Sequence, residues 1–250
     1  AQEILEKIKK EIEEKQLKLK LAVVLIGNNS VSKSYTVKKQ EACQKVGVDF
    51  ELFNFPADIN EEELKKEIRK IVEDKNISGL VIQLPLPENF NKTEILNLIP
   101  PEKDIDVLSE ANFEKFSKGE LSILPPVVEA IKFILEKYNI SLTGKKIALI
   151  GRGKLVGKPL AVWLSNQGAD FSVIHRGVEN MAEIIKKSDI VISGAGSPNL
   201  VRGDMIKNGA VIIDAGASFK EGEVKGDIEK EAYEKASLVV PVPGGIGPIT

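Results

Sequence analysis

Cysteine and histidine are almost absent from this sequence. Its 250 residues include one cysteine, Cys43, and one histidine, His175. A single cysteine cannot form an internal disulfide, and protein zinc sites combine several cysteine, histidine or carboxylate ligands. We therefore expect no disulfide framework and no metal site. A chain without disulfides suits a reducing compartment, most simply the cytoplasm.

The sequence also lacks an excess of one charge and any long apolar run. Lysine and arginine number 35 against 37 aspartates and glutamates, and the lysines are interleaved with glutamates. Nucleic-acid binding usually needs a basic patch, and a membrane-spanning helix needs about 20 consecutive apolar residues. Neither nucleic acid nor a membrane is therefore an expected partner.

Strand and helix patterns alternate along the chain. Short apolar segments without polar alternation, such as residues 19–26 and ISGLVIQ, predict strands buried on both faces. Helical patterns lie between them, and Asn60 followed by Glu63 predicts a capping box at the start of one helix. The alternation predicts an α/β fold with mainly parallel sheets covered by helices.

The pattern changes after about Gly119. A helix opened by prolines runs from there to near Tyr138, and we interpret it as the hinge between two domains. Residues 1–120 are predicted to form a three-layer α/β substrate domain. Residues 121–250 are predicted to form a Rossmann-like parallel sheet, with a cleft between the two domains.

A glycine-rich turn lies between the predicted strand KKIALI and the helix that follows it. Gly151, Gly153 and Gly157 occupy this turn, with a spacing one residue longer than G-x-G-x-x-G. Glycines allow backbone N–H groups to approach a pyrophosphate at the N-terminus of a helix, and Pro159 suits the first helical turn. The turn predicts a dinucleotide site, and an ordinary strand-to-helix turn is the alternative.

The next predicted strand ends at His175 and Arg176. Sites specific for NAD carry an acidic residue near this position, which binds the ribose hydroxyls. An arginine instead suits the 2′-phosphate of NADP, and Arg152 can supply a second cation. NADP is therefore the expected cofactor. A lone histidine is usually structural, so His175 is assigned no role in proton transfer.

Polar residues of the first half fall where a substrate site is expected. Tyr35 and Lys39 are four residues apart and share one face of a predicted helix. Gln83 ends a short strand, and ligands of open α/β sheets bind at the carboxyl ends of strands. Asp104 and Asp106 follow in an irregular stretch. A surface pair and turn-forming aspartates are the alternatives.

Six segments, taken in order, resemble one family over nearly the whole chain. They are S-x-x-Y-x-x-x-K, VIQLPLP, KDID, GRG-x-x-VGKP, the HR pair and the terminal PVPGGIGPIT. Together they resemble the bifunctional methylenetetrahydrofolate dehydrogenase / methenyltetrahydrofolate cyclohydrolase family. The resemblance implies two α/β domains around a cleft, with folate bound by the first domain and NADP by the second. It also implies a homodimer that works in one-carbon metabolism, including purine biosynthesis.

The resemblance assigns roles to four residues of the first domain. Lys39 would be the catalytic acid and base, and Gln83 would hydrogen-bond to it and tune it. Tyr35 would stack against the folate, and Asp106 would anchor the pterin ring through its N–H groups. Hydride would leave the methylene bridge for the nicotinamide, and the resulting methenyl cation would add water and open to formyltetrahydrofolate. A lysine beside such a cation loses its proton more readily, so it can assist the attack of water.

The resemblance also extends the binding residues. The terminal glycine-rich turn would contact the substrate at Pro243, Gly244 and Gly245. The residues expected at the cofactor are Gly151, Arg152, Gly153, Val156, Gly157, Pro159, His175 and Arg176.

Several positions depart from the family pattern. Glu41 stands where many members have a second lysine, Val107 replaces a glycine, and Gly153 replaces a serine. Residues 125–128 read PPVV where the family has a proline-cysteine-threonine-proline segment. The family also continues beyond the position of Thr250 into a helix that packs on the first domain, and this sequence ends without it.

These departures leave one alternative within the family and two outside it. The first is a dehydrogenase with reduced or lost cyclohydrolase activity. A non-catalytic folate- or nucleotide-binding protein would be expected to lose Lys39 first. A shikimate-dehydrogenase-like enzyme would share the two-domain plan but would not explain QLPLP or PVPGGIGP.

Overall fold

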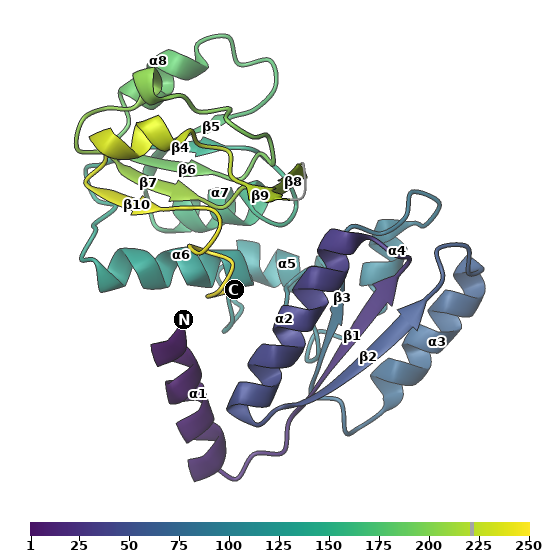
Figure 1. Ribbon diagram of the computed structural model, residues 1–250. Helices are drawn as coiled ribbons and strands as arrows, with labels where there is room; N and C mark the ends of the chain where they lie inside the picture. The colour runs from purple at the N-terminus through teal and green to yellow at the C-terminus, as the bar shows by residue number, and fades with distance from the viewer. Residues whose placement is uncertain (221–222) are drawn as a thin grey trace. The chain divides into compact units, whose positions relative to one another are not determined.

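The computed structural model describes residues 1–220 and 223–250, and the chain folds as two compact units. The first unit is Ala1–Ile123 and the second is Leu124–Thr250. Each unit contains its own parallel sheet and its own apolar core (Figure 1). None of the helices in the described part of the chain is both long and apolar enough to cross a bilayer.

The first unit has a three-stranded sheet in the order β2-β1-β3, with both pairings parallel. Its elements are α1 (Gln2–Glu14), β1 (Lys20–Ile26), α2 (Ser30–Val46), β2 (Asp49–Phe55), α3 (Glu61–Glu73), β3 (Gly79–Ile82), α4 (Lys92–Leu96) and α5 (Glu110–Ser117). Ala22, Val24 and Ile26 of β1 pack with α3 and α4 in one core cluster. Alternate residues of a strand point to opposite faces, so Val23 and Leu25 face the other side, where α2 lies (Figure 1). Helices on both faces explain why β3, and β1 after Lys20, are apolar throughout, as the sequence predicted.

Side-chain caps and a glycine define the helix ends of this unit. Asn29 accepts a hydrogen bond from the Ser32 N–H at the start of α2, and Gly47 ends that helix with φ of 80°. Asn60 accepts from the N–H groups of Glu62 and Glu63, which confirms the predicted cap of α3. An amide or hydroxyl oxygen at this position satisfies N–H groups that have no partner within the helix.

The second unit has a five-stranded parallel sheet in the order β10-β7-β6-β4-β5. Its elements are α6 (Pro126–Lys137), β4 (Lys146–Ile150), α7 (Gly157–Asn166), β5 (Asp170–Ile174), α8 (Met181–Lys186), β6 (Ile190–Ser193), β7 (Val211–Asp214), β8 (Ser218–Lys220), β9 (Glu223–Lys225) and β10 (Leu238–Val240), with 3₁₀ turns at Gly203–Met205 and Lys230–Lys235. Strand β4 lies between β5 and β6, so the chain builds outward from β4 first on one side and then on the other. Open α/β sheets bind ligands at such a switch point, outside the carboxyl ends of the strands.

Three elements differ from the sequence expectation. Helices α4 and α5 were not predicted, although Asn91 and Ser109 cap them as Asn60 caps α3. The antiparallel pair β8 and β9 was also not predicted. The last strand ends at Val240, although the apolar segment SLVVPV continues to Val242, because Pro241 lacks the N–H group that the next ladder bond would need.

Candidate active site

The structure brings Lys39 and Gln83 into direct contact. Lys39 lies on α2 and Gln83 directly follows β3, and the Lys39 Nζ donates to Gln83 Oε1 at 2.8 Å. The amide of Gln83 is fixed at its other end, because its Nε2 donates to the carbonyl of Leu84 at 2.9 Å. Two residues 44 positions apart in the sequence therefore meet, in the hydrogen bond that the family resemblance implied.

Tyr35 lies one helical turn before Lys39 on α2. Its side chain remains 37% exposed, whereas Thr36 beside it is buried and donates its hydroxyl to the Ser32 carbonyl. An exposed aromatic ring next to a buried helix face offers a surface on which a flat ring can stack. Tyr35 and Lys39 thus share one face of α2, as their spacing predicted.

Asp106 lies within electrostatic reach of Lys39. Burial raises the pKa of Asp106 above its ordinary value, and the positive charge of Lys39 partly opposes this rise, while nearby Asp104 adds to it. A carboxyl group kept from water binds a hydrogen-bond donor more strongly than one on the surface. Lys39, Gln83 and Asp106 therefore form one cluster, built from α2, the end of β3 and the loop before α5.

A second carboxylate holds the loop that carries Asp106. Asp104 is 1% exposed and accepts hydrogen bonds from the N–H groups of Leu108 and Ser109 and from the Ser109 hydroxyl at 2.6 Å. Asp104 is thus a turn-forming aspartate, whereas Asp106 is the carboxyl group on which the charge of Lys39 acts. Val107, directly after Asp106, has φ of 56°, a left-handed conformation that β-branched residues rarely adopt. The sequence did not reveal this support, since it depends on contacts within an irregular loop.

Glu41 lies on another face of α2. Residues two apart on a helix are separated by about 200° around its axis, so Glu41 points away from the face that carries Lys39. Its side chain is exposed. The charge of Glu41 therefore lies apart from the Lys39–Gln83 contact.

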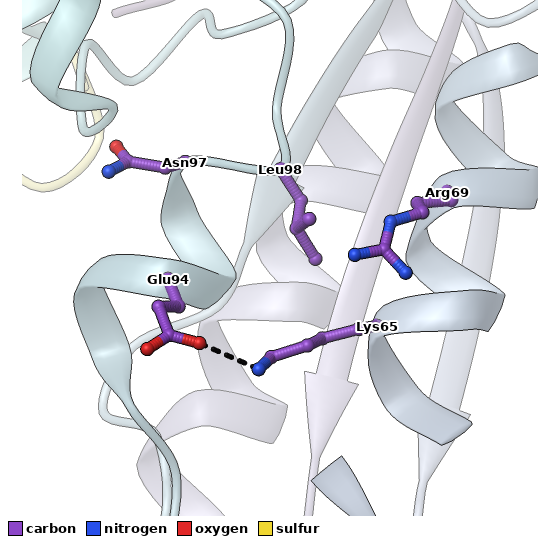
Figure 2. Close-up of a pocket in the computed structure, with 5 residues that line it drawn as sticks. All are labelled: Lys65, Arg69, Glu94, Asn97 and Leu98. Atoms are coloured by element: carbon purple, nitrogen blue, oxygen red, sulfur yellow. Dashed lines mark hydrogen bonds and ion pairs between the residues drawn. The ribbon is translucent and has the colours of Figure 1, made fainter. Parts of the chain in front are cut away.

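Two hollows of the first unit lie apart from this cluster. One, of about 280 Å³, is lined by Lys65, Arg69, Glu94, Asn97 and Leu98 between α3 and α4 (Figure 2). Lys65 Nζ contacts Glu94 at 2.7 Å and also pairs with two glutamates of its own helix. These carboxylates neutralise the charge of Lys65, and its ion pair with Glu94 connects α3 to α4. None of the expected catalytic residues lines this hollow.

The glycine turn of the second unit leaves no room for side chains at two positions. Gly151 has φ of 100°, and a Cβ there would lie 2.6 Å from the Gly194 carbonyl oxygen. A Cβ on Gly157 would lie 2.2 Å from the Gly151 carbonyl oxygen, whereas one on Gly153 would meet no atom within 4 Å. The turn thus folds tightly on itself and on the end of β6.

The N-terminus of α7 has the features of an anion site. Val156 precedes this helix and provides no side-chain cap, and the N–H of Lys158 in the first turn donates to the Gly153 carbonyl of the glycine turn at 2.9 Å. Pro159 is buried in the first turn, where the lack of an N–H group costs nothing. Oriented N–H groups and the helix dipole favour a phosphate at this end.

The two arginines expected at the cofactor, Arg152 in the glycine turn and Arg176 after β5, lie on the surface. Arg152 and Arg176 are exposed, and neither pairs with a carboxylate among the residues that the structure describes. His175 is exposed rather than packed, and its Nδ1 lies 2.8 Å from the Arg176 carbonyl oxygen. Both guanidinium groups can therefore receive a phosphate without first breaking an ion pair.

The terminal glycine-rich turn follows β10. Pro243 and Gly244 are exposed, and Gly244 has φ of 100°. The N–H of Gly245 donates to the Pro241 carbonyl at 2.9 Å, which closes the turn. Backbone groups at Pro243 and Gly244 are thus available to a ligand.

Two family models together match most of the chain. Residues 1–106 match the catalytic domain of tetrahydrofolate dehydrogenase/cyclohydrolase, and residues 125–250 match its NAD(P)-binding domain. The bifunctional protein FolD of Hydrogenobaculum sp. is 38% identical over 253 residues, which cover all of this chain and 91% of that protein.

Solved structures agree with these matches. The bifunctional FolD enzyme of Campylobacter jejuni superposes with a TM-score of 0.92 at 34% identity, covering 99% of this chain and 89% of that one. The Trypanosoma brucei methylenetetrahydrofolate dehydrogenase-cyclohydrolase, solved with NADP and an inhibitor, gives 0.91 at 31% identity, covering 98% and 90%. With Lys39 and Gln83 in contact in the first unit and a tight glycine-rich turn before α7 in the second, the chain belongs to the tetrahydrofolate dehydrogenase/cyclohydrolase family.

Proposed function

We propose that this enzyme oxidises methylenetetrahydrofolate with NADP and hydrolyses the methenyl product to formyltetrahydrofolate. The observation that carries the proposal is the contact of 2.8 Å between Lys39 Nζ and Gln83 Oε1, beside Asp106 in the family's catalytic domain. The second unit is the family's NAD(P)-binding domain, and a similar enzyme binds NADP.

Lys39 is proposed to move the proton in the hydrolytic step. Its amine contacts a neutral amide oxygen, so Gln83 fixes its position without holding its proton as a carboxylate would. An amine held in this way, beside a cationic methenyl group, can take a proton from attacking water and return one as the ring opens. Lys39 is thus the acid and base, and Gln83 orients it.

Asp106 and Tyr35 are proposed to hold the folate. Asp106 can accept hydrogen bonds from the N–H groups of the pterin, and its reduced contact with water strengthens them. The exposed ring of Tyr35 can stack on the substrate one turn from Lys39. Pro243, Gly244 and Gly245 are proposed as further substrate contacts through their backbone.

The glycine turn and the two arginines fit NADP. Gly151 and Gly157 keep the backbone clear of side chains, and the positive end of the α7 dipole favours the pyrophosphate there. Arg152 and Arg176 would bind the 2′-phosphate, and Gly153, Val156, Pro159 and His175 complete the proposed site. When bound, NADP supplies a nicotinamide that accepts the hydride of the methylene carbon.

The alternative, a dehydrogenase with weak cyclohydrolase activity, is not favoured. Lys39, Gln83 and Asp106 are all present and in one cluster, and Glu41 lies on another face of α2. The FolD proteins of Hydrogenobaculum sp. and Campylobacter jejuni, which match nearly the full chain, are named bifunctional enzymes.

The two activities can be tested in one spectrophotometric assay. With methylenetetrahydrofolate and NADP, methenyltetrahydrofolate absorbance should first rise and then decay. The Lys39→Met variant should lose at least 100-fold in the decay, since a general acid and base contributes on the order of 10²–10⁴-fold. Lys38→Met, at an exposed lysine next to it on α2, should behave like the parent enzyme. Near-normal decay in Lys39→Met would remove this lysine from the mechanism.

The choice of NADP over NAD tests the cofactor site. In the Arg152→Ala/Arg176→Ala double variant, kcat/KM for NADP should fall at least tenfold while that for NAD changes little, because charge-assisted hydrogen bonds to a phosphate are lost. Arg202→Ala is the matched control, since Arg202 is also exposed in the second unit but pairs with Asp204 at 3.2 Å. An unchanged ratio in the double variant would contradict the assignment of the two arginines.

We further propose a homodimer that acts in the cytoplasm and supplies purine biosynthesis with formyl groups. Support for a dimer comes from β2, which pairs only with β1 among the described strands and leaves Leu52 45% exposed. Sheet edges of this kind pair readily with another chain. A reducing compartment is supported by Cys43, which is a buried free thiol.

A further inference from the structure

Two loops of the second unit meet at the switch point of its sheet. The glycine turn follows β4, and residues 194–197 follow the neighbouring strand β6. A Cβ on Gly151 would lie 2.6 Å from the Gly194 carbonyl oxygen, and a Cβ on Gly194 would lie 2.2 Å from Val156 Cγ1. The loop after β6, residues 194–197, is therefore packed directly against the dinucleotide turn. Any ligand seated at the switch point has this loop as a neighbour.

The loop after β6 wraps around a buried carboxylate. Asp227 is 0% exposed, and its Oδ1 accepts a hydrogen bond from the Ser197 N–H at 2.7 Å. Its Oδ2 accepts from the Ser193 hydroxyl at 2.7 Å and from the N–H groups of Ala195 and Gly196 at 2.7 and 3.2 Å. Three consecutive N–H groups converging on one point form an anion-binding nest, and here the protein's own carboxylate occupies it.

Asp227 is itself held firmly in place. Its carbonyl accepts from the Val201 N–H at 3.0 Å, and a Cβ on Gly216 would lie 1.9 Å from its Oδ2. The next residue, Ile228, donates its N–H to the buried Asp214 at the end of β7. The carboxylate thus links the ends of β6 and β7, and it can hold the loop after β6 in only one position.

We propose that Asp227 is a positioning residue for the cofactor, one that shapes the wall of the NADP site through the loop after β6. This inference rests on the proposed use of NADP by the second unit. Without the carboxylate, three partly buried N–H groups of the loop would lose their protein partner, and the loop would rearrange to pair them with water. Binding of NADP would then have to restore the loop, and the affinity would fall by the cost of that ordering.

The hydrolytic activity distinguishes a specific effect on NADP binding from a general loss of folding or activity. Hydrolysis of methenyltetrahydrofolate needs no hydride acceptor, and its proposed residues Lys39, Gln83 and Asp106 belong to the first unit. Loss of Asp227 should therefore raise KM for NADP and leave hydrolysis, measured without NADP, unchanged.

The variant Asp227→Asn should raise KM for NADP about tenfold or more, because charge-assisted hydrogen bonds are replaced by an amide whose NH₂ group opposes the loop N–H groups. Ser193→Ala removes one hydrogen-bond donor to the Asp227 carboxylate and should raise KM for NADP by a smaller factor. This variant tests the proposal if Asp227→Asn does not fold. Asp189→Asn is the control, since Asp189 accepts from the Lys146 N–H at 2.9 Å at the opposite end of the same sheet. It should lower stability without changing KM.

Three measurements on each variant decide the proposal: KM for NADP, the hydrolysis rate without NADP, and the urea midpoint. A raised KM with normal hydrolysis in Asp227→Asn and Ser193→Ala, absent from Asp189→Asn, supports it. An unchanged KM in the Asp227 or Ser193 variants, or a rise that Asp189→Asn shares in proportion to lost stability, overturns it. Failure of the parent enzyme to use NADP would instead overturn the proposed function.

Discussion

At the scale of single residues, the candidate site contains a strained backbone beside the carboxyl group of Asp106. Val107 is 1% exposed and adopts a left-handed conformation immediately after Asp106. That conformation costs a non-glycine residue about 1–2 kcal/mol. The hydrogen bonds of Asp104 to Leu108 and Ser109 hold the loop in this state. The strain therefore helps to fix the direction in which Asp106 points.

Replacing Val107 by glycine tests this strain. Val81→Gly in β3, at an equally buried position without positive φ, should lower the free energy of unfolding by roughly 3 kcal/mol or more. Val107→Gly loses the same side chain but regains the strain energy, so its loss should be smaller by about 1–2 kcal/mol. Urea unfolding followed by circular dichroism gives both values. Equal losses in the two variants would show that no strain is stored at Val107.

The sequence predicted those site residues whose positions follow from regular structure. Helical spacing placed Tyr35 and Lys39 on one face of α2, and the end of a short strand placed Gln83 opposite them. Asp104 and Asp227 were not predicted as supports, because their partners lie in irregular loops. Asp227 meets the Ser197 N–H 30 positions away in sequence, and no local periodicity records such a contact.

At the scale of elements, the start of α7 is the feature with least tolerance for change. The fingerprint spacing predicted a tight turn here, and the structure distinguishes its glycines. Gly157 and Gly151 are in mutual contact, whereas Gly153 faces open space. The spacing alone could not rank the three, since the ranking depends on how the turn folds back on itself.

Alanine substitutions in this turn should separate close packing from the mere presence of glycine. Gly157→Ala would place Cβ 2.2 Å from the Gly151 carbonyl oxygen, so the turn must open and KM for NADP should rise at least tenfold. Gly153→Ala should change KM for NADP less than twofold. The added Cβ would meet no atom within 4 Å, and residue 153 does not have a positive φ. Steady-state kinetics with varied NADP provides both numbers. A larger effect at Gly153 than at Gly157 would contradict this reading of the turn.

Short helices show why part of the element order escaped prediction. Helix α4 has 5 residues and α5 has 8, too few for a clear helical period. Their caps were nevertheless visible, since Asn91 is followed by Glu94 as Asn60 is followed by Glu63. The polar start signal was thus present, and the apolar repeat that usually accompanies it was too short to recognise.

At the scale of the whole molecule, two units with separate cores can be followed separately as they unfold. The only tryptophan, Trp163, is 6% exposed on α7, so its fluorescence reports the second unit. That unit contains a buried carboxyl group, Asp214, whose protonation should make the stability of the unit depend on pH. Burial raises the pKa of Asp214 from 3.8 to about 6, although backbone N–H groups of residues 216, 227 and 228 oppose the rise.

Asp214 should make the second unit less stable as the pH rises from about 4 to about 6. In this range the unfolded chain has released the proton of Asp214 while the folded unit still holds it, so each step up in pH favours unfolding. Below this range both states are protonated, and above it both are ionised, so the loss of roughly 3 kcal/mol is complete near pH 6. In Asp214→Asn this decline should disappear from urea unfolding followed by Trp163 fluorescence. Asp189→Asn should retain the decline, because bonds from Lys207 and the Lys146 N–H lower the pKa of Asp189, so its contribution is lost only as the pH falls. A decline that survives in Asp214→Asn would assign the pH dependence to another group.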